Sequence, residues 1–500
     1  MRGYEATHFQ PEGAISVKKS SAKPRVSQLK LDLLPGKPIL VDFDGEDVSG
    51  NGGLLLAGQL EKATGFLKKA AEQLDDHRTS SLIKHNLFEE VAQRVLQIVA
   101  GFAACSDSDV MRNDPALKMA VGRDPLSGDA LASQPSQSRL ENGRSFKELY
   151  RLSQWLVDYY IQCHRKPPKH LFLDFDGSAI ETYGMQLNAF YRGGPYKKNM
   201  YFPLFVFDQN GWLLVAALRP GDQGEIEMAL PVLKKLVKRL RKAWPRTRIA
   251  VRADGAFTSN AFYKWMDENN VQYVLGIKEN HALAIETKYL RREAEKKFKR
   301  KLDEPRYKGK AGSKRKNAVQ KELRSISNRK ERCKRLKEFE ARRVRCFGDF
   351  KYAARSWNKE RRVIARCDYT DKGLEMRYVV TNIQNLTARE IYEEIYCKRA
   401  LAELGIKNIK ETRCTRLSCS QFKANMFRLL LHAMAYVVIH QIRLKFSTPR
   451  MSFEQFRRRF VSVAMRVQEC RKEVWVTISK SYHAAKEFRL AAKRLGMARC

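Results

Sequence analysis

Apolar residues recur along this chain with two different periods. A spacing of three or four positions predicts amphipathic helices, and it is found at residues 53–104, 146–164, 228–244 and 421–444. Short apolar runs separated by turn residues predict neighbouring strands instead. Such runs stand at residues 170–179, 200–208 and 212–220. The polar stretch 106–143, which is rich in Asp, Ser, Pro and Gly, predicts a long loop.

The strand pattern then alternates with helix. RIAVRADGAF (248–257) and VQYVLGIKEN (271–280) predict two more strands on either side of a short helix. Three adjacent strands followed by strand–helix alternation indicate an α/β protein with a mixed sheet. The N-terminal region, by contrast, is predicted to be mostly helical.

A basic segment interrupts this pattern. Residues 288–345 contain 25 Lys or Arg and 8 Asp or Glu, too few apolar residues for a core of their own. Strand-like runs follow at 343–357, 361–370 and 377–383, and a helix is expected from Ala388 to Thr412. The texture indicates a basic, partly β insertion.

Charge narrows the class of partner. The formal net charge is +40, which implies a polyanionic partner, most commonly nucleic acid, with a membrane surface as the weaker alternative. The longest apolar stretch, 429–440, is too short to span a bilayer, and the N-terminus has no signal-peptide pattern. The ten cysteines form no Cys-x-x-Cys pair, so we expect free thiols in a reducing cytoplasm and no zinc ribbon.

Carboxylates end two of the apolar runs. LFLDFDGSA (171–179) carries Asp174 and Asp176, and Asp254 ends the run at 248–253. Two such acids on neighbouring strands are suited to hold divalent cations, although Asp followed by Gly-Ser is also common in structural turns. The near copy VDFDGED (41–47) precedes a glycine-rich segment, so we expect a short strand or loop with solvated acids there.

One predicted helix presents four functional groups together. Tyr396, Arg399, Glu403 and Lys410 stand at offsets 0, 3, 7 and 14. At about 100° per residue they fall within roughly a 60° arc of one helix face. The alternative is an ordinary solvated face, because Arg399 and Glu403 also form an i,i+4 ion pair.

The pattern Tyr-x2-Arg-x3-Glu-x6-Lys resembles the signature of a branch of DDE transposases from bacterial insertion sequences. Further segments resemble the same family in the same order: ASQPSQSRLEN (132–142), LDFDGS (173–178), LRPGD (218–222), RADGAF (252–257) and CTRLSCSQFKANMFRLLLHAMAYVV (414–438). The likeness extends from about residue 40 to 490. One departure is Gly177-Ser178, where related sequences more often have a Thr after the Asp.

The resemblance implies a ribonuclease H-like catalytic core interrupted by the basic/β insertion. Asp176, Asp254 and Glu403 would be catalytic and would hold two Mg²⁺ ions, for which Mn²⁺ can substitute. Tyr396, Arg399 and Lys410 would bind DNA. The implied regions are an end-binding part at 1–165, a catalytic domain at 166–445 with an insertion at about 284–385, and a C-terminal region at 446–500.

The implied function is cleavage at the ends of an insertion sequence and joining of the 3′-OH ends to target DNA. The partners would be the terminal inverted repeats and target DNA, with a homodimer on DNA, no membrane, and a bacterial cytoplasmic, nucleoid-associated location. Two alternatives stay open: a non-catalytic DNA-binding protein, and a haloacid-dehalogenase-like phosphatase with Asp174 as nucleophile and Asp176 as acid/base. Trp357, among basic residues, could stack on an unpaired base or be structural.

Overall fold

The computed structural model describes residues 29–42, 45–224, 226–302, 321, 323–446 and 451–496. The chain divides into two compact units, Met1–Asp47 and Val48–Cys500. The described part of the first unit is an antiparallel hairpin of β1 (Leu29–Leu34) and β2 (Lys37–Val41). Asp42 follows β2 directly and is half-buried, whereas Asp44 lies outside the described residues.

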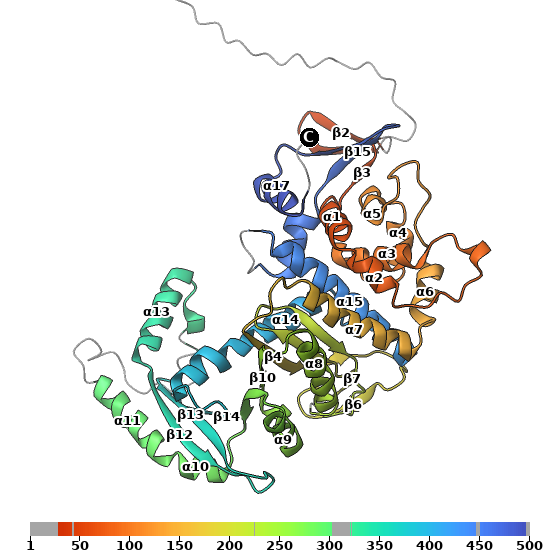
Figure 1. Cartoon of the computed structure of the whole chain (residues 1–500). Coiled ribbons are helices and arrows are strands. Elements are labelled where there is room, and N and C mark those ends of the chain that lie inside the picture. Colours follow the sequence, from red (N-terminus) through yellow and green to blue (C-terminus); the bar gives the residue numbers. More distant parts are fainter. Residues whose placement is uncertain are drawn as a thin grey trace, which may run out of the picture. The chain divides into compact units, whose positions relative to one another are not determined.

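An eight-stranded sheet, counted over the described residues, organises the second unit (Figure 1). Its order is β12-β13-β14-β11-β10-β4-β8-β9. The core strands are β4 (His170–Gly177), β8 (Leu204–Asp208), β9 (Leu213–Ala217), β10 (Arg248–Ala253) and β11 (Gln272–Ile277). β4, β10 and β11 are parallel to one another. β8 is antiparallel to β4, and β9 is antiparallel to β8. This order and direction are those of a ribonuclease H-like core, so the predicted fold class is confirmed.

Helices cover both faces of this sheet. α8 (Ala229–Ala243) and α9 (Asn260–Glu268) are the crossovers that parallel strands require, and they share a core with Leu173, Phe175 and Val206. On the opposite face, Phe205 and Phe207 of β8 belong to the core that contains α14 (Ala400–Glu411) and α15 (Phe422–Arg443). Asp174 and Asp176 are register partners of Phe207 and Phe205, so they lie on the α14 face.

The N-terminal part of this unit is mostly helical, as predicted. Its helices are α1 (Leu54–Thr64), α2 (Phe66–Ala71), α3 (Leu87–Ala100), α4 (Asp107–Met111), α5 (Pro115–Val121), α6 (Gln134–Asn142) and α7 (Phe146–Gln162). The prediction of a single long loop at 106–143 is wrong, because α4, α5 and α6 lie within it. The polar residues there begin helices: Asp114 caps α5 and accepts a hydrogen bond from the Leu117 amide, with Pro115 at the first turn.

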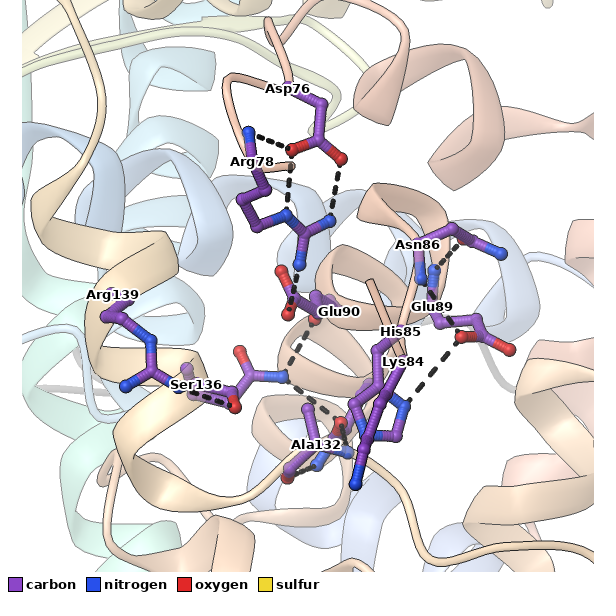
Figure 2. A network of polar contacts seen from close by, with 12 residues as sticks. Asp76, Arg78, Lys84, His85, Asn86, Glu89, Glu90, Ala132, Ser136 and Arg139 are labelled. Atoms are coloured by element: carbon purple, nitrogen blue, oxygen red, sulfur yellow. Dashed lines mark hydrogen bonds and ion pairs between the residues drawn. The ribbon is translucent and has the colours of Figure 1, made fainter. Parts of the chain in front are cut away.

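Ion pairs fix the connection between α2 and α3 (Figure 2). Arg78 binds both carboxylate oxygens of Asp76 and also reaches Glu90 at 2.8 Å. Burial raises the pKa of Glu90 to about 7, and Arg78 works against that rise. Asn86 and Glu89 form the capping box that begins α3.

The insertion extends the core sheet. It contains α11 (Lys288–Leu302), α13 (Arg329–Arg342), β12 (Val344–Tyr352), β13 (Arg361–Thr370) and β14 (Gly373–Thr381). β14 pairs antiparallel with β11. The sparse apolar residues of α11, Leu290, Ala294 and Phe298, are buried, and α11 packs on β12 and β13. The basic helices therefore depend on the insertion strands for a core.

The long helix α15 (Phe422–Arg443) lies in the core of the second unit. The apolar run at 429–440 was expected to be too short to cross a bilayer. The whole helix has 22 residues and, alone among the described helices, is long and apolar enough to do so. Its most apolar window is 78% buried inside the protein, as is typical of a core helix.

The C-terminal part packs on the same core. It contains α16 (Phe453–Phe456), η5 (Arg457–Val461), β15 (Met465–Glu469), β16 (Val474–Ile478) and α17 (Ala485–Arg494). β15 pairs with β16 and with β3 (Val48–Ser49), which precedes the N-terminal helices.

Candidate active site at the carboxyl edge of the sheet

Asp176 and Asp254 lie at the carboxyl ends of neighbouring parallel strands. β4 and β10 are in register, with Asp174 opposite Arg252. Asp176 and Asp254 stand two residues further along each strand, so both acids are brought to the same edge. One carboxylate oxygen of Asp254 accepts a hydrogen bond from the Ala256 amide at 2.9 Å, which fixes the turn after β10.

The third element of the site is an irregular helix. The predicted helix from Ala388 to Thr412 is present, but its regular α-helical geometry is not. It comprises a π-helix η3 (Glu390–Ile395), a 3₁₀-helix η4 (Tyr396–Arg399) and α14 (Ala400–Glu411). Side chains three residues apart eclipse in a 3₁₀-helix, so Tyr396 and Arg399 lie in line. The helix type changes at the site, so the 60° arc calculated for a regular helix does not describe how these side chains are arranged.

Arg399 connects the helix with the strands. Its guanidinium donates to Asp176 Oδ2 at 3.2 Å and to Glu403 Oε1 at 3.2 Å. Burial raises the pKa of Asp176 to about 6; Arg399 lowers it, whereas the nearby Asp254 and Glu403 raise it. Burial opposes the charge on Arg399, but Asp176, Tyr396, Asp254 and Glu403 together raise its pKa. One guanidinium thus lies among three carboxylates and contacts two of them directly.

The hydroxyl of Tyr396 lies against Gly276, close to the same group of charges. A Cβ atom on Gly276 of β11 would lie 2.5 Å from the Tyr396 hydroxyl, so only glycine leaves room for this phenol. Burial raises the pKa of Tyr396, and Asp254 adds to the rise. A groove of about 1020 Å³ begins at Asp254, Tyr396 and Arg399 and continues over the insertion. Its basic lining residues there include Arg343, Arg345, Arg366 and Arg377.

Lys410 lies apart from the other predicted residues. It follows Glu403 by two helical turns of α14, about 10 Å along the axis. Its side chain is half-buried near Cys414, whose pKa burial raises and Lys410 lowers. Of the six predicted site residues, the structure thus brings five together. Gly405 sets the close approach of α14, because a Cβ there would lie 2.7 Å from the ring of Phe207.

A buried ion pair supports the site and was not predicted. Arg252 binds both carboxylate oxygens of Asp174 at 2.6 and 2.7 Å, and both side chains are almost completely buried. The third contact of Arg252 is a hydrogen bond of 2.9 Å from Nη1 to the carbonyl oxygen of Ile395. That carbonyl lies where the π-helix gives way to the 3₁₀-helix. The sequence signal was present: opposite charges stand two residues before each strand-end acid.

The donor set suits a divalent cation. Asp176, Asp254 and Glu403 offer carboxylate oxygens, the ligands that Mg²⁺ prefers, and a cation would offset the burial and the charges of Asp254 and Glu403, which together raise the pKa of Asp176. In this structure the Arg399 guanidinium supplies the positive charge beside Asp176 and Glu403. Among the described residues, one group of three has its metal-type ligand atoms within 4.8 Å of one another: Asp75, His77 and Glu148. Arg151 and Arg144 already neutralise that group.

The structure bears on the phosphatase alternative and on the role of Trp357. A nucleophilic Asp174 would need an accessible oxygen, but this residue is 0% exposed and both its oxygens bind Arg252. The Trp357 ring packs edge-to-face on Tyr263 and Tyr352, at 5.3 and 5.5 Å between centroids. These contacts give Trp357 a structural role between the insertion and α9 of the core.

The fold and the site together define an α/β protein with a ribonuclease H-like core and an acidic cluster at the carboxyl edge of its sheet. The family model described as transposase DDE domain group 1 matches residues 31–500, so the chain belongs to this family of transposases. Comparison with curated proteins gives no match. Among solved structures, the chain is similar to a cryo-EM structure of the piggyBac transposase synaptic complex with hairpin DNA. The identity is 12%, with 88% of this chain and 81% of that chain covered and a TM-score of 0.36.

Proposed function

We propose that this transposase cleaves DNA at the ends of a bacterial insertion sequence and joins the resulting 3′-OH ends to target DNA. The observation that carries the proposal is the convergence of Asp176, Asp254 and Glu403 around Arg399. Three acids from β4, β10 and α14 meet at one edge of a ribonuclease H-like sheet, within a protein whose net charge of +40 suits a polyanionic substrate.

Asp176, Asp254 and Glu403 would hold two Mg²⁺ ions, for which Mn²⁺ can substitute. When bound, the two ions supply Lewis acidity that activates a water or a 3′-OH and stabilises the leaving oxygen. Arg399 and Tyr396 lie beside the acids, where a guanidinium and a phenol can bind the phosphates that flank the scissile bond. Lys410, two turns away on α14, would contact a more distant phosphate.

The groove lined by Arg343, Arg345, Arg366 and Arg377, here called the basic groove, would give DNA a path away from the acids. Arg345 lies between Asp368 and Glu393, and Arg366 lies 5.0 Å from the ring centroid of Tyr392. These arginines are held in place before any ligand arrives, which lowers the entropy cost of phosphate binding. We propose that residues 284–385 bind DNA as an insertion within a catalytic domain at 166–445.

The remaining regions complete the proposed assembly. Residues 1–165 would bind the terminal inverted repeats, and 446–500 would form a C-terminal region. Two copies would act together on a pair of ends, in the bacterial cytoplasm at the nucleoid.

The decisive experiment incubates the purified protein with DNA that carries its own element's ends and Mg²⁺, and maps the cut positions on both strands. Cuts at the element boundary that require Mg²⁺ support the proposal. Specific end binding without any cut would favour a non-catalytic DNA-binding protein. Hydrolysis of small phosphomonoesters without DNA cleavage would favour a phosphatase.

A further inference from the structure

The outer side of α8 carries a row of exposed lysines. Lys234, Lys238 and Lys242 stand four residues apart, so they lie on one side of the helix. The side of α8 that packs on the core sheet is apolar and consists of Leu233, Leu236, Val237 and Leu240. At about 100° per residue, these apolar residues lie on the opposite side of the helix from the lysines. The three lysines, here called the lysine row, therefore face solvent along about 12 Å of the helix axis.

The other basic side chains of α8 already have partners. Arg239 binds both carboxylate oxygens of Asp158 on α7. Arg241 donates to backbone carbonyl oxygens that follow α9. The ammonium group of Lys235 lies 4.6 Å from the ring centroid of Tyr150. Within the described parts of the chain, by contrast, the lysine row has no ion-pair partner.

The surroundings of the lysine row add further positive charge. Residues 228–253 contain nine Lys or Arg and no Asp or Glu. At the end of α8, the ring centroids of His164 and Trp244 are 5.4 Å apart. This contact brings the loop 165–169, which has three basic residues and no acid, to the same end of the helix. The lysine row thus lies in a region of positive potential that attracts a polyanion.

The lysine row and the acids lie on opposite faces of the core sheet. α8 shares a core with Leu173 and Phe175 of β4, whereas Asp174 and Asp176 lie on the α14 face. A straight duplex held by the acids would therefore have the sheet and α8 between it and the lysine row. The two places would take different segments of DNA.

Charge and shape select duplex DNA as the partner. A second copy of the chain, with a net charge of +40, would be repelled by the lysine row. A helix that binds a membrane surface inserts an apolar face into the lipid, but the apolar side of α8 is buried in the core. Phosphates follow one another every 3.4 Å or so along each strand of a duplex, so a row about 12 Å long can contact several of them.

We propose that the lysine row binds the phosphate backbone of duplex DNA, as a second DNA site separate from the acids. The inference rests on the proposed function for the identity of the polyanion. Lysine contacts to phosphates position a duplex and do not read its sequence. The site therefore suits DNA of any sequence, such as target DNA or the DNA that flanks an element.

The test counts, by sedimentation, how many short labelled duplexes of random sequence the full chain binds at saturation. A variant that combines Lys234→Gln, Lys238→Gln and Lys242→Gln should bind one duplex fewer per chain than the wild type. The affinity for that duplex should fall at least about tenfold, because three phosphate contacts are lost. Urea unfolding without DNA should be unchanged, since the lysine row forms no ion pair among the described residues.

The matched control replaces Lys486, Arg489 and Lys493 of α17 by Gln, which removes the same charge from another helix. It should bind as many duplexes as the wild type. A lysine-row variant that binds as many duplexes as this control would overturn the inference. So would a variant that keeps all its duplexes but loses binding to phosphatidylserine vesicles, which would indicate a membrane surface.

Cleavage of element ends by the wild type tests the proposed function separately. If the wild type cuts element ends and the lysine-row variant binds every duplex, only the inference fails. If the variant loses one duplex and the wild type never cuts, only the proposed function fails.

Discussion

The carboxyl edge of the core sheet and the basic helices of the insertion use charge in opposite ways. At the edge, Asp174, Arg252, Asp176 and Arg399 are buried or nearly so, and each contacts another charged group. On α11 the charges are exposed and pair along their own helix, as Lys297 does with Glu293. Breaking a fully buried pair such as Arg252–Asp174 costs about 3–5 kcal/mol, whereas an exposed pair contributes about 0–1 kcal/mol.

This difference in burial predicts that single substitutions matter at the edge of the sheet, whereas the basic helices act through their total charge. A single residue at the edge fixes the position of others, so its loss should change chemistry or folding measurably. A single lysine on α11 or α13 fixes little, and these helices should act through the sum of their charges on a polyanion.

The largest expected effect is the loss of a strand-end or helix acid. Asp176→Asn, Asp254→Asn and Glu403→Gln should each lower the rate of DNA cleavage by about 10³-fold or more, because a neutral amide is a poor Mg²⁺ ligand and the cations contribute several kcal/mol. Binding of element ends, measured by gel shift, should persist. Asp42→Asn in the N-terminal hairpin is the control and should cut at the wild-type rate. Near wild-type cutting by any of the three variants would remove that residue from the site.

The second effect concerns Arg252. Arg252→Gln loses both the Asp174 pair and the bond to the Ile395 carbonyl, so the turn carrying Tyr396 and Arg399 should lose its position. We expect cleavage per folded molecule to fall about 10- to 100-fold, as small displacements of positioning groups do. Arg252→Lys keeps the charge, so its cleavage rate per folded molecule should lie between those of the wild type and Arg252→Gln.

Arg361→Gln is the matched control for Arg252. Arg361 is equally buried, pairs with Asp267 and donates to the Tyr273 hydroxyl, but it lies on β13 of the insertion. Both variants should lower the free energy of unfolding by about 3–5 kcal/mol. If both lose cleavage to the same extent at matched folded fractions, Arg252 has a structural role only.

A third prediction divides the roles along the irregular helix. Arg399→Ala should lower cleavage about tenfold at saturating Mg²⁺, because lost phosphate positioning is not restored by metal. Lys410→Ala should have a smaller effect, since Lys410 lies two turns away. Glu403→Asp should instead require more Mg²⁺, because its carboxylate recedes from the ion. A Mg²⁺ titration of cleavage rates checks this, and identical responses of the three variants would contradict the division.

The fourth prediction uses stability instead of activity. The pKa of Asp176 is raised to about 6, against roughly 4 for an ordinary aspartate. A raised carboxyl pKa contributes stability at low pH that is lost as the pH rises through about 4 to 6. Without metal, Asp176→Asn should therefore increase the free energy of unfolding by about 1–3 kcal/mol at pH 7, and by little at pH 4.

Urea unfolding at both pH values measures this difference. Mg²⁺ should stabilise the wild type at pH 7 and leave Asp176→Asn almost unchanged, because binding to the folded state alone adds stability. A variant less stable than the wild type at pH 7 without metal would show that Arg399 fully compensates the charge of Asp176.

The smallest effect is expected from the insertion. Replacing the exposed Lys330, Arg332 and Lys334 of α13 by Gln should reduce the slope of log affinity against log salt by about 0.9 for each lost phosphate contact. The control replaces the exposed Lys486, Arg489 and Lys493 of α17 and should leave the slope unchanged. Equal slopes for the α13 variant and the wild type would show that this face of the insertion does not contact DNA.

The sequence by itself determined the order of strands and helices in the core, and it marked Asp176, Asp254 and the helix of Tyr396, Arg399 and Glu403. These features follow from local patterns: apolar period, turn residues, and acids at the ends of apolar runs. The same local reasoning failed at 106–143, where caps of short helices were taken for loop residues.

The tertiary structure alone decided the rest. The pairing of Arg252 with Asp174 joins residues 78 positions apart, and the same arginine donates to the Ile395 carbonyl, where the π-helix changes to a 3₁₀-helix. Gly177 at the end of β4 leaves room for the ring of Phe202, whose carbonyl oxygen accepts a hydrogen bond from Arg219. Period and propensity describe neighbours along the chain, whereas burial, register and ion pairing are set by residues far apart in sequence, and these fix the geometry of the site.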